Sequence, residues 1–246
     1  MRSPRIRVAV FLTAFHPGGT ERQMIELISR LDRSLFDVSV ACSHRQGAWL
    51  PRVEGCAPIT EFPIRAFARA STLAQAAAFA RWCRARRIAV VHTCEFYSNI
   101  FALPVAAMAG VPIRIGSRRE VILDRTRSQF AAQRLAYRFA SVVVTNARSA
   151  AGALSAEGIG RERIEIIPNG VAIDLYPSRA RSGEIRTILT VANLRPEKAH
   201  EVLFEAAARL LRRYPSLRFQ IVGDGPRGGE LRGLASALGI RARVDF

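Results

Sequence analysis

The only lysine of the chain, Lys198, lies in a stretch whose residue types suit anion binding. Within Thr187–His200, the apolar run Ile188–Val191 predicts a buried strand, and Asn193–Pro196 reads as a tight polar turn. Apolar residues at helical spacing then predict a helix over Glu197–Arg213. The first amides of a helix lack partners and carry partial positive charge, so a lysine beside them completes an anion site. We therefore predict that Lys198 binds a phosphate group; the alternative is an ordinary exposed lysine in a first helical turn.

A glycine pair offers a second place for an anion. Gly18 and Gly19 separate the apolar run Val8–Leu12 from a predicted helix over Thr20–Leu31. Because they lack side chains, these glycines let the backbone pass close to a ligand and point its amides at an anion. The first residue of the helix and Gln23 have the spacing of a capping box, which predicts where the helix starts. The alternative is a plain glycine-rich turn.

Polar side chains also follow two further predicted strands. His92 follows the strand Ile88–Val91, and the pair Arg118 and Arg119 follows the strand Ile113–Ile115. In open parallel sheets, ligands bind beyond the carboxyl ends of the strands. We predict that His92 is an active-site polar group and that the two arginines contact a carboxylate or phosphate. The alternatives are a histidine hydrogen-bonded into a loop and a solvated basic loop.

Five short segments of the chain occur in an order that is typical of one enzyme family. They are Gly18-Gly19-Thr20-Glu21, Val142–Asn146, Ile167-Pro168-Asn169-Gly170-Val171, Val191–His200 and Gly223-Asp224-Gly225-Pro226. Each segment is weak alone, but the five in sequence resemble the family 4 glycosyltransferases of the two-domain, nucleotide-sugar type. The resemblance covers nearly the whole chain but only part of the family's length.

The resemblance implies a donor site made from both halves of the chain. It implies that the loop at Gly18 and Gly19 approaches the phosphates of the sugar nucleotide from the first domain. It also implies that Lys198 holds the donor diphosphate from the second domain, and we expect Arg195 to add positive charge there. His92 would then lie near the transferred sugar.

Other positions match the family's turn between domains or depart from its pattern. The segment with Asn169 and Gly170 resembles the passage between the two domains, although Asn-Gly is also ordinary turn chemistry. Asn193 stands where the family usually has an arginine, five residues before the lysine, and a neutral amide does not replace a guanidinium. Arg118 stands where many relatives have a histidine, so we assign Arg118 and Arg119 to an anion, such as one on the acceptor.

The function that the resemblance implies is sugar transfer from a nucleotide-sugar donor to an acceptor, with retention at the anomeric carbon. The resemblance implies no cofactor beyond this co-substrate and no required metal, and the lack of an acidic D-x-D-like pair to hold a nucleotide-bound cation agrees with that. Many relatives build cell-surface polysaccharides or glycolipids at the inner membrane face. We therefore expect a sugar or lipid-linked acceptor and a cytoplasmic protein with peripheral contact to that membrane face.

Composition limits the partners. The chain has 246 residues, 49% of them hydrophobic and 23% charged, which is typical of a globular protein. Its formal net charge of +17 suggests anionic partners, although compositional bias toward arginine explains it equally well. No basic block is interleaved with aromatic residues, so nucleic acid is not expected. The four cysteines are scattered without zinc spacing and indicate free thiols in a reducing compartment.

The pattern of elements predicts an α/β fold with two Rossmann-like, doubly wound parallel-sheet domains, the GT-B type. Strands are predicted at Val8–Leu12, Phe36–Ala41, Ile59–Ile64, Ile88–Val91, Ile113–Ile115, Val142–Val144, Ile164–Ile167, Ile188–Val191, Leu217–Val222 and Val244–Phe246, and helices at Thr20–Leu31, Ser71–Arg87, Thr126–Ala140, Arg148–Glu157, Glu197–Arg213 and Gly229–Leu238. We expect an acceptor-side domain over 1–178, a donor domain over 179–246 and a linker over Tyr176–Gly183. The second domain is shorter than a complete one of ~100–150 residues, so we expect a truncated polypeptide.

Two other functions compete with a working glycosyltransferase. One is a truncated, non-catalytic remnant that only binds diphosphates. The other is an NAD(P)-binding oxidoreductase, because Gly223, Gly225 and Gly228 match G-x-G-x-x-G and Asp245 follows about 20 residues later. Pro226 removes an amide that would serve a pyrophosphate, which weakens that alternative. In addition, the basic end of the helix Ser71–Arg87 suits either the helix dipole or a membrane-facing helix.

Overall fold

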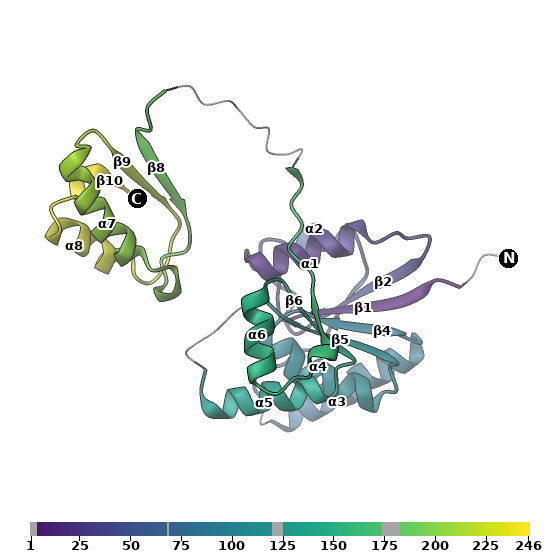
Figure 1. Ribbon diagram of the computed structural model, residues 1–246. Coiled ribbons are helices and arrows are strands. Elements are labelled where there is room, and N and C mark those ends of the chain that lie inside the picture. The colour runs from purple at the N-terminus through teal and green to yellow at the C-terminus, as the bar shows by residue number, and fades with distance from the viewer. Residues whose placement is uncertain (1–3, 68, 120–124, 174–182) are drawn as a thin grey trace. The chain divides into compact units, whose positions relative to one another are not determined.

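The computed structural model describes residues 4–67, 69–119, 125–173 and 183–246 (Figure 1). These residues form two compact units, Met1–Ala172 and Ile173–Phe246, each of which is described by itself. The sequence placed the boundary six residues later, after residue 178. The linker predicted over Tyr176–Gly183 lies outside the described residues as far as Ser182.

The first unit is built on a seven-stranded sheet with the order β3-β2-β1-β4-β5-β6-β7, and all its strand pairs are parallel (Figure 1). The strands are β1 (Ile6–Leu12), β2 (Phe36–Cys42), β3 (Ile59–Glu61), β4 (Val90–Thr93), β5 (Ile113–Arg118), β6 (Val142–Thr145) and β7 (Ile164–Ile166). Because β1 lies between β2 and β4, the strand order reverses there. Ligands of such sheets bind beyond the carboxyl ends at this reversal. The predicted α/β fold with a parallel sheet is confirmed.

Six α-helices are described in the first unit. They are α1 (Gly19–Arg30), α2 (Leu50–Glu54), α3 (Ala70–Ala85), α4 (Phe96–Met108), α5 (Arg127–Arg138) and α6 (Arg148–Ala156). The sequence missed α2 and α4. Helix α4 has no polar face that would give it a helical period, since eight of its thirteen residues are buried, and it contains Pro104. Its start is fixed by a capping box between Glu95 and Ser98.

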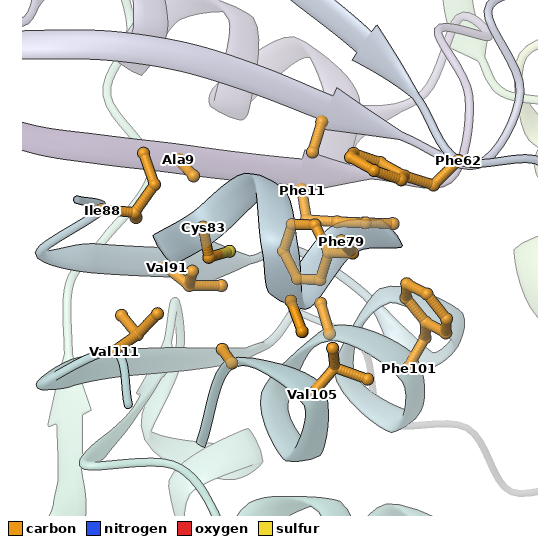
Figure 2. Close-up of a cluster of buried hydrophobic side chains, with 14 of the residues drawn as sticks. Ala9, Phe11, Phe62, Phe79, Cys83, Ile88, Val91, Phe101, Val105 and Val111 are labelled. Atoms are coloured by element: carbon orange, nitrogen blue, oxygen red, sulfur yellow. The ribbon is translucent and has the colours of Figure 1, made fainter. Parts of the chain in front are cut away.

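The core of the first unit surrounds β1, which is buried on both faces as parallel strands usually are. Val10 and Leu12 pack with the helices α1 and α2, whereas Phe11 packs on the other face with α3 and α4. Figure 2 shows this second cluster, in which the ring of Phe79 meets that of Phe11 edge-on at 5.2 Å between centroids. Phe62 meets Phe79 in the same way, also at 5.2 Å. Phe79 therefore links β1, α3 and the end of β3.

The second unit has a three-stranded parallel sheet with the order β10-β9-β8. Its elements are β8 (Thr187–Val191), α7 (His200–Arg213), β9 (Arg218–Val222), α8 (Gly228–Ala237) and β10 (Val244–Asp245). One core, with Phe204, Phe219 and Leu231 fully buried, packs the two helices on the sheet. The strand predicted as buried is exposed on its other side, where Leu189 and Val191 are 57% and 72% exposed. The prediction of a fully buried strand is therefore wrong, because among the described residues only one face of β8 is covered.

The cysteines of the described chain are free thiols. Burial raises the pKa of the Cys42 and Cys83 thiols to about 12, so both are neutral at physiological pH. No group of three metal-binding side chains is found among the described residues. In the same residues, no helix is both long and apolar enough to cross a membrane.

Substitution of Phe79 by alanine should lower the free energy of unfolding by about 3–5 kcal/mol, because it leaves a cavity among four aromatic rings. The measurement is urea-induced unfolding followed by circular dichroism. The control is Leu73→Ala on the same helix, where the leucine is 74% exposed and the change should stay within about 0.5 kcal/mol. Equal losses in both variants would contradict this account of the core.

Candidate functional site

Two carboxylates lie where β1 and β4 end. Glu95 begins α4 by accepting hydrogen bonds from the amides of Tyr97 and Ser98 at 2.8 and 2.9 Å. The hydroxyl of Thr13, just after β1, donates to the same carboxylate at 2.5 Å. Glu21 is partly buried, and its pKa is raised mainly by that burial and further by the charge of Glu95. The reversal of strand order therefore carries a pair of acids: the sequence analysis named Glu21 within a family segment but did not single out Glu95.

The glycine loop after β1 leads directly into α1. Gly18 is the N-cap and the helix begins at Gly19, so the predicted start at Thr20 with its capping box is wrong. A side chain at Gly18 would meet the carboxylate of Glu21, with 2.2 Å from Cβ to Oε2, whereas at Gly19 nothing lies within 4 Å. The space beside Gly19 is open, as the predicted approach of a ligand requires.

Gln23 has a different role from capping. Its side-chain amide donates to the carbonyl of Gly170 at 2.9 Å and accepts from the Gly170 amide at 3.0 Å. The next residue back, Asn169, accepts a hydrogen bond from Arg119 at 2.8 Å. The segment predicted as the turn between domains is thus held at two consecutive residues by α1 and by the end of β5.

The paired arginines have different partners. Arg118 is the last residue of β5 and is buried, and its guanidinium contacts both carboxylate oxygens of Glu157 at 2.7 and 2.6 Å. Arg119 is half-buried, and among the described residues no carboxylate forms an ion pair with it. Burial lowers the pKa of the Arg119 guanidinium, which nonetheless stays charged. Because the carboxylate of Glu157 already pairs with Arg118, Arg119 is the member of the pair that can bind an external anion.

His92 lies inside β4, because this strand extends to Thr93; its predicted place after the strand end is wrong. The residue is 8% exposed, and its Nε2 lies 3.0 Å from the hydroxyl of Ser117 on β5. Burial, with the nearby positive charge of Arg119 as the second cause, lowers the pKa of His92 to about 4. The imidazole is therefore neutral at physiological pH and joins two strands.

A small cavity collects the polar groups of this end of the sheet. Its volume is about 10 Å³, roughly the room that one water molecule needs. The lining includes Thr20 from α1, Glu95, Ser117, Arg119 and Arg125. The first unit therefore brings Arg119 next to Glu95, the acid after β4, whereas His92 does not line the cavity but contacts its wall through Ser117.

Lys198 lies in a short 3-10 turn, Pro196–Lys198, and the left-handed residue Ala199 (φ 49°) separates this turn from α7. The predicted helix start at Glu197 is wrong by three residues. Lys198 and Arg195 are both exposed, and among the described residues neither forms an ion pair. The turn thus presents two free cations before the first amides of α7.

The loop after β9 holds this turn in place through Leu194, which is 2% exposed. The Leu194 amide donates to the carbonyl of Asp224 at 3.0 Å, and the Arg227 amide donates to the Leu194 carbonyl at 3.2 Å. A Cβ at Gly225 would lie 2.6 Å from the Leu194 carbonyl oxygen. A Cβ at Gly223 would lie 2.0 Å from the carbonyl oxygen of Ala192, the residue after β8. These glycines permit close packing of two loops, which accounts for the fingerprint-like spacing without a dinucleotide.

His200, the first residue of α7, was also not singled out from the sequence. It is 1% exposed, and neither ring nitrogen has a hydrogen-bond partner among the described residues. The sequence offered no signal for this burial, since His200 follows three polar or small residues in a turn. Because Gly18 and Gly19 belong to one unit and Lys198 to the other, their meeting on one diphosphate stays a prediction.

Two family models match the chain: Glycosyltransferase Family 4 over residues 17–175 and Glycosyl transferases group 1 over residues 177–246. The chain belongs to the family 4 glycosyltransferases. This confirms the resemblance stated from the five segments. The two matches meet between residues 175 and 177, within the predicted linker.

Relatives and solved structures agree with this membership. A D-inositol 3-phosphate glycosyltransferase of Nocardia farcinica is 36% identical over 122 residues, which are 43% of this chain and 27% of that protein. A phosphatidyl-myo-inositol mannosyltransferase of Mycobacterium tuberculosis is 37% identical over 92 residues, 35% of this chain and 24% of that protein. The chain thus matches about a quarter of the length of these relatives.

The fold is that of the GT-B glycosyltransferases. Anabaena HepE, solved in complex with UDP and glucose, has a TM-score of 0.81 at 18% identity, over 98% of this chain and 69% of that one. The lipopolysaccharide outer core galactosyltransferase WaaB, solved in its apo form, has a TM-score of 0.71 at 18% identity, over 97% and 67% of the two chains. At this identity the likeness shows the fold.

Replacing Arg118 should lower the free energy of unfolding more than replacing Arg119 does. Arg118→Gln leaves the carboxylate of Glu157 without its buried partner and should destabilise the protein by about 3–5 kcal/mol. Arg119→Gln removes no ion pair that the described residues form and should cost about 1 kcal/mol or less, the worth of one hydrogen bond to Asn169. Urea unfolding of the two variants tests this; equal losses would show that the structural roles are not divided in this way.

The buried imidazole should make stability depend on pH. Since the pKa of His92 in the folded protein is about 4 and that of an unfolded histidine is about 6.5, the unfolded chain binds a proton in this interval that the folded chain does not. Stability attributable to His92 is therefore lost as pH falls from about 6.5 to 4, by roughly 3 kcal/mol in total. Unfolding free energies of the wild type and His92→Gln should converge over this interval, and parallel pH curves would contradict the assignment.

Proposed function

We propose that this chain binds a nucleotide-sugar donor through its second unit and serves in sugar transfer to an acceptor held by its first unit. The observation that carries the proposal is the turn at Lys198, where two exposed cations stand before the amides of α7 at the carboxyl end of β8. A diphosphate suits this place because helix amides and free cations both favour negative charge. Membership of the family, and a neighbour solved with UDP and glucose, support a nucleotide-sugar as the ligand.

The chemistry we propose is stabilisation of the leaving diphosphate. In such a reaction the bond between the sugar and the diphosphate breaks, and fixed positive groups lower the energy of the charge that develops. Lys198 and Arg195, with the amides at Gly18 and Gly19, would supply that charge without a metal ion. Retention at the anomeric carbon is part of the proposal by resemblance. His92 enters as a neutral group that positions Ser117, since it is buried within β4.

For the acceptor we propose a sugar or lipid-linked molecule with an anionic group bound by Arg119. The half-buried guanidinium lacks an ion pair within the described chain and lines a cavity with Glu95. Its charge suits a phosphate, and the acid beside it suits sugar hydroxyls. Two relatives bear names with inositol phosphate or phosphatidylinositol, which agrees with such an acceptor. For a lipid-linked acceptor, the proposal includes peripheral contact with the inner membrane face.

A second candidate is a protein that binds diphosphates without transferring sugar. Asn193 favours it, because a neutral amide stands where the resembled enzymes place an arginine. This candidate predicts UDP binding with no release of sugar from any nucleotide donor. Turnover of UDP- and GDP-sugars by the folded chain distinguishes the two.

Removal of the single lysine should weaken nucleotide binding. Lys198→Ala should lower the affinity for UDP by about 10- to 100-fold, the equivalent of one charge-assisted hydrogen bond to a phosphate. Isothermal titration calorimetry measures this directly. The matched control is Arg213→Ala in the last turn of α7, which removes an exposed cation at the other end of the same helix and should leave the affinity unchanged. An unchanged UDP affinity in Lys198→Ala would refute the site.

A further inference from the structure

We propose that the outer face of α5 docks on an anionic membrane surface. This inference deepens the proposed function, because it names the face on which a lipid-linked acceptor would be presented. The face consists of Arg127, Phe130, Ala131, Arg134, Leu135 and Arg138, which line a groove of about 610 Å³. Their spacing of three and four residues places them along one side of the helix.

The packing of α5 fixes which side faces outward. Its opposite side carries Gln133, Ala136 and Tyr137, all buried. Tyr137 is 1% exposed and donates to the carbonyl of Ser117, so the helix cannot rotate without breaking a buried contact. Leu135 is in consequence held outward at 54% exposure, between arginines one residue before and three residues after it.

The charge of this face is free to bind an external anion. Among the described residues, Arg127, Arg134 and Arg138 form no ion pair or hydrogen bond. The acid that lines the groove, Glu157, is already held by Arg118. Three unneutralised guanidinium groups around an exposed leucine complement a surface that is anionic above and apolar just beneath. A bilayer with anionic lipids has that layering.

Helix α5 also starts beside the cavity that holds Arg119. The residue before its N-cap Thr126, Arg125, lines that cavity and lies over the ring of Phe96 at 4.3 Å. Arg125 also donates a hydrogen bond to the side chain of Gln133, in the middle of α5, at 3.4 Å. A lipid headgroup bound at the surface along α5 would thus be next to the acceptor site.

The basic end of α3, which the sequence suggested as a membrane-facing helix, is partly used within the protein. Arg84 donates to the carbonyl of Met108 at 2.7 Å, and Arg86 donates to Ser39 at 3.3 Å and lies over the ring of Trp82. Leu73 and Arg81 are both exposed on α3. They supply matched controls for α5.

Sedimentation of the full chain with vesicles tests the proposal. Wild type should bind vesicles of phosphatidylglycerol and phosphatidylcholine but not vesicles of phosphatidylcholine alone. Arg134→Glu should weaken binding about 30-fold, because it changes two charges near the surface. Leu135→Ser should weaken binding about tenfold by removing apolar contact. The controls Arg81→Glu and Leu73→Ser should bind as wild type does.

Three results would overturn the proposal. The first is no binding of the folded wild type to anionic vesicles, and the second is an equal loss in the α3 controls. The third is a loss in Arg134→Glu but not in Leu135→Ser, together with equally tight binding to duplex DNA, which would indicate a site for any polyanion. UDP titration of the same variants separates this inference from the proposed function: UDP binding should be intact in all of them whether or not vesicles bind.

Discussion

The burial of β1 on both faces and its pairing on both edges determine where everything else in the first unit can lie. From Ala9 to Leu12, no residue of the strand is exposed. Because the chain runs outward from β1 in both directions, through β2 on one side and β4 on the other, the loops that follow β1 and β4 diverge. The open space beside Gly19, the acid at Glu95 and the guanidinium of Arg119, which forms no ion pair within the described chain, all follow the ends of strands in this arrangement.

The second unit uses the same principle on a smaller scale. A strand ends, and a buried residue after it fixes the loop that carries the polar groups. Leu194 has this role: its backbone is bound by the loop after β9, and glycines at 223 and 225 are needed because any Cβ there would collide with the loop after β8. Because the anchor is buried, the turn can expose Lys198 and Arg195 and still keep a fixed geometry. Preorganised charge of this kind is what stabilisation of a leaving group requires.

Sequence reasoning worked where one element determines its own pattern. Continuous apolar runs predicted the parallel strands, as at Val8–Leu12, and amphipathic spacing predicted most helices. It failed where distant residues decide. Helix α4 is buried over most of its surface and has no polar face, so it had no period to detect. The sequence also could not tell that Glu157, 39 residues away, would form the ion pair with Arg118 rather than with Arg119. His92 looked like a loop residue because its strand continues into polar positions that are buried between neighbours.

The large positive charge is a poor guide to ligands until its internal uses are known. Arg114 donates to the carbonyls of Val111, Pro112 and Phe139, and Arg163 donates to those of Tyr137 and Ala140. These guanidinium groups satisfy carbonyls at helix ends and turns, which would otherwise lack partners. The cations that indicate a ligand are those that make no such hydrogen bond within the described chain. In a chain that otherwise relies on arginine, the lysine in the turn between β8 and α7 is a compact point charge on a flexible stem. Such a charge suits a phosphate whose oxygens change position as a bond breaks.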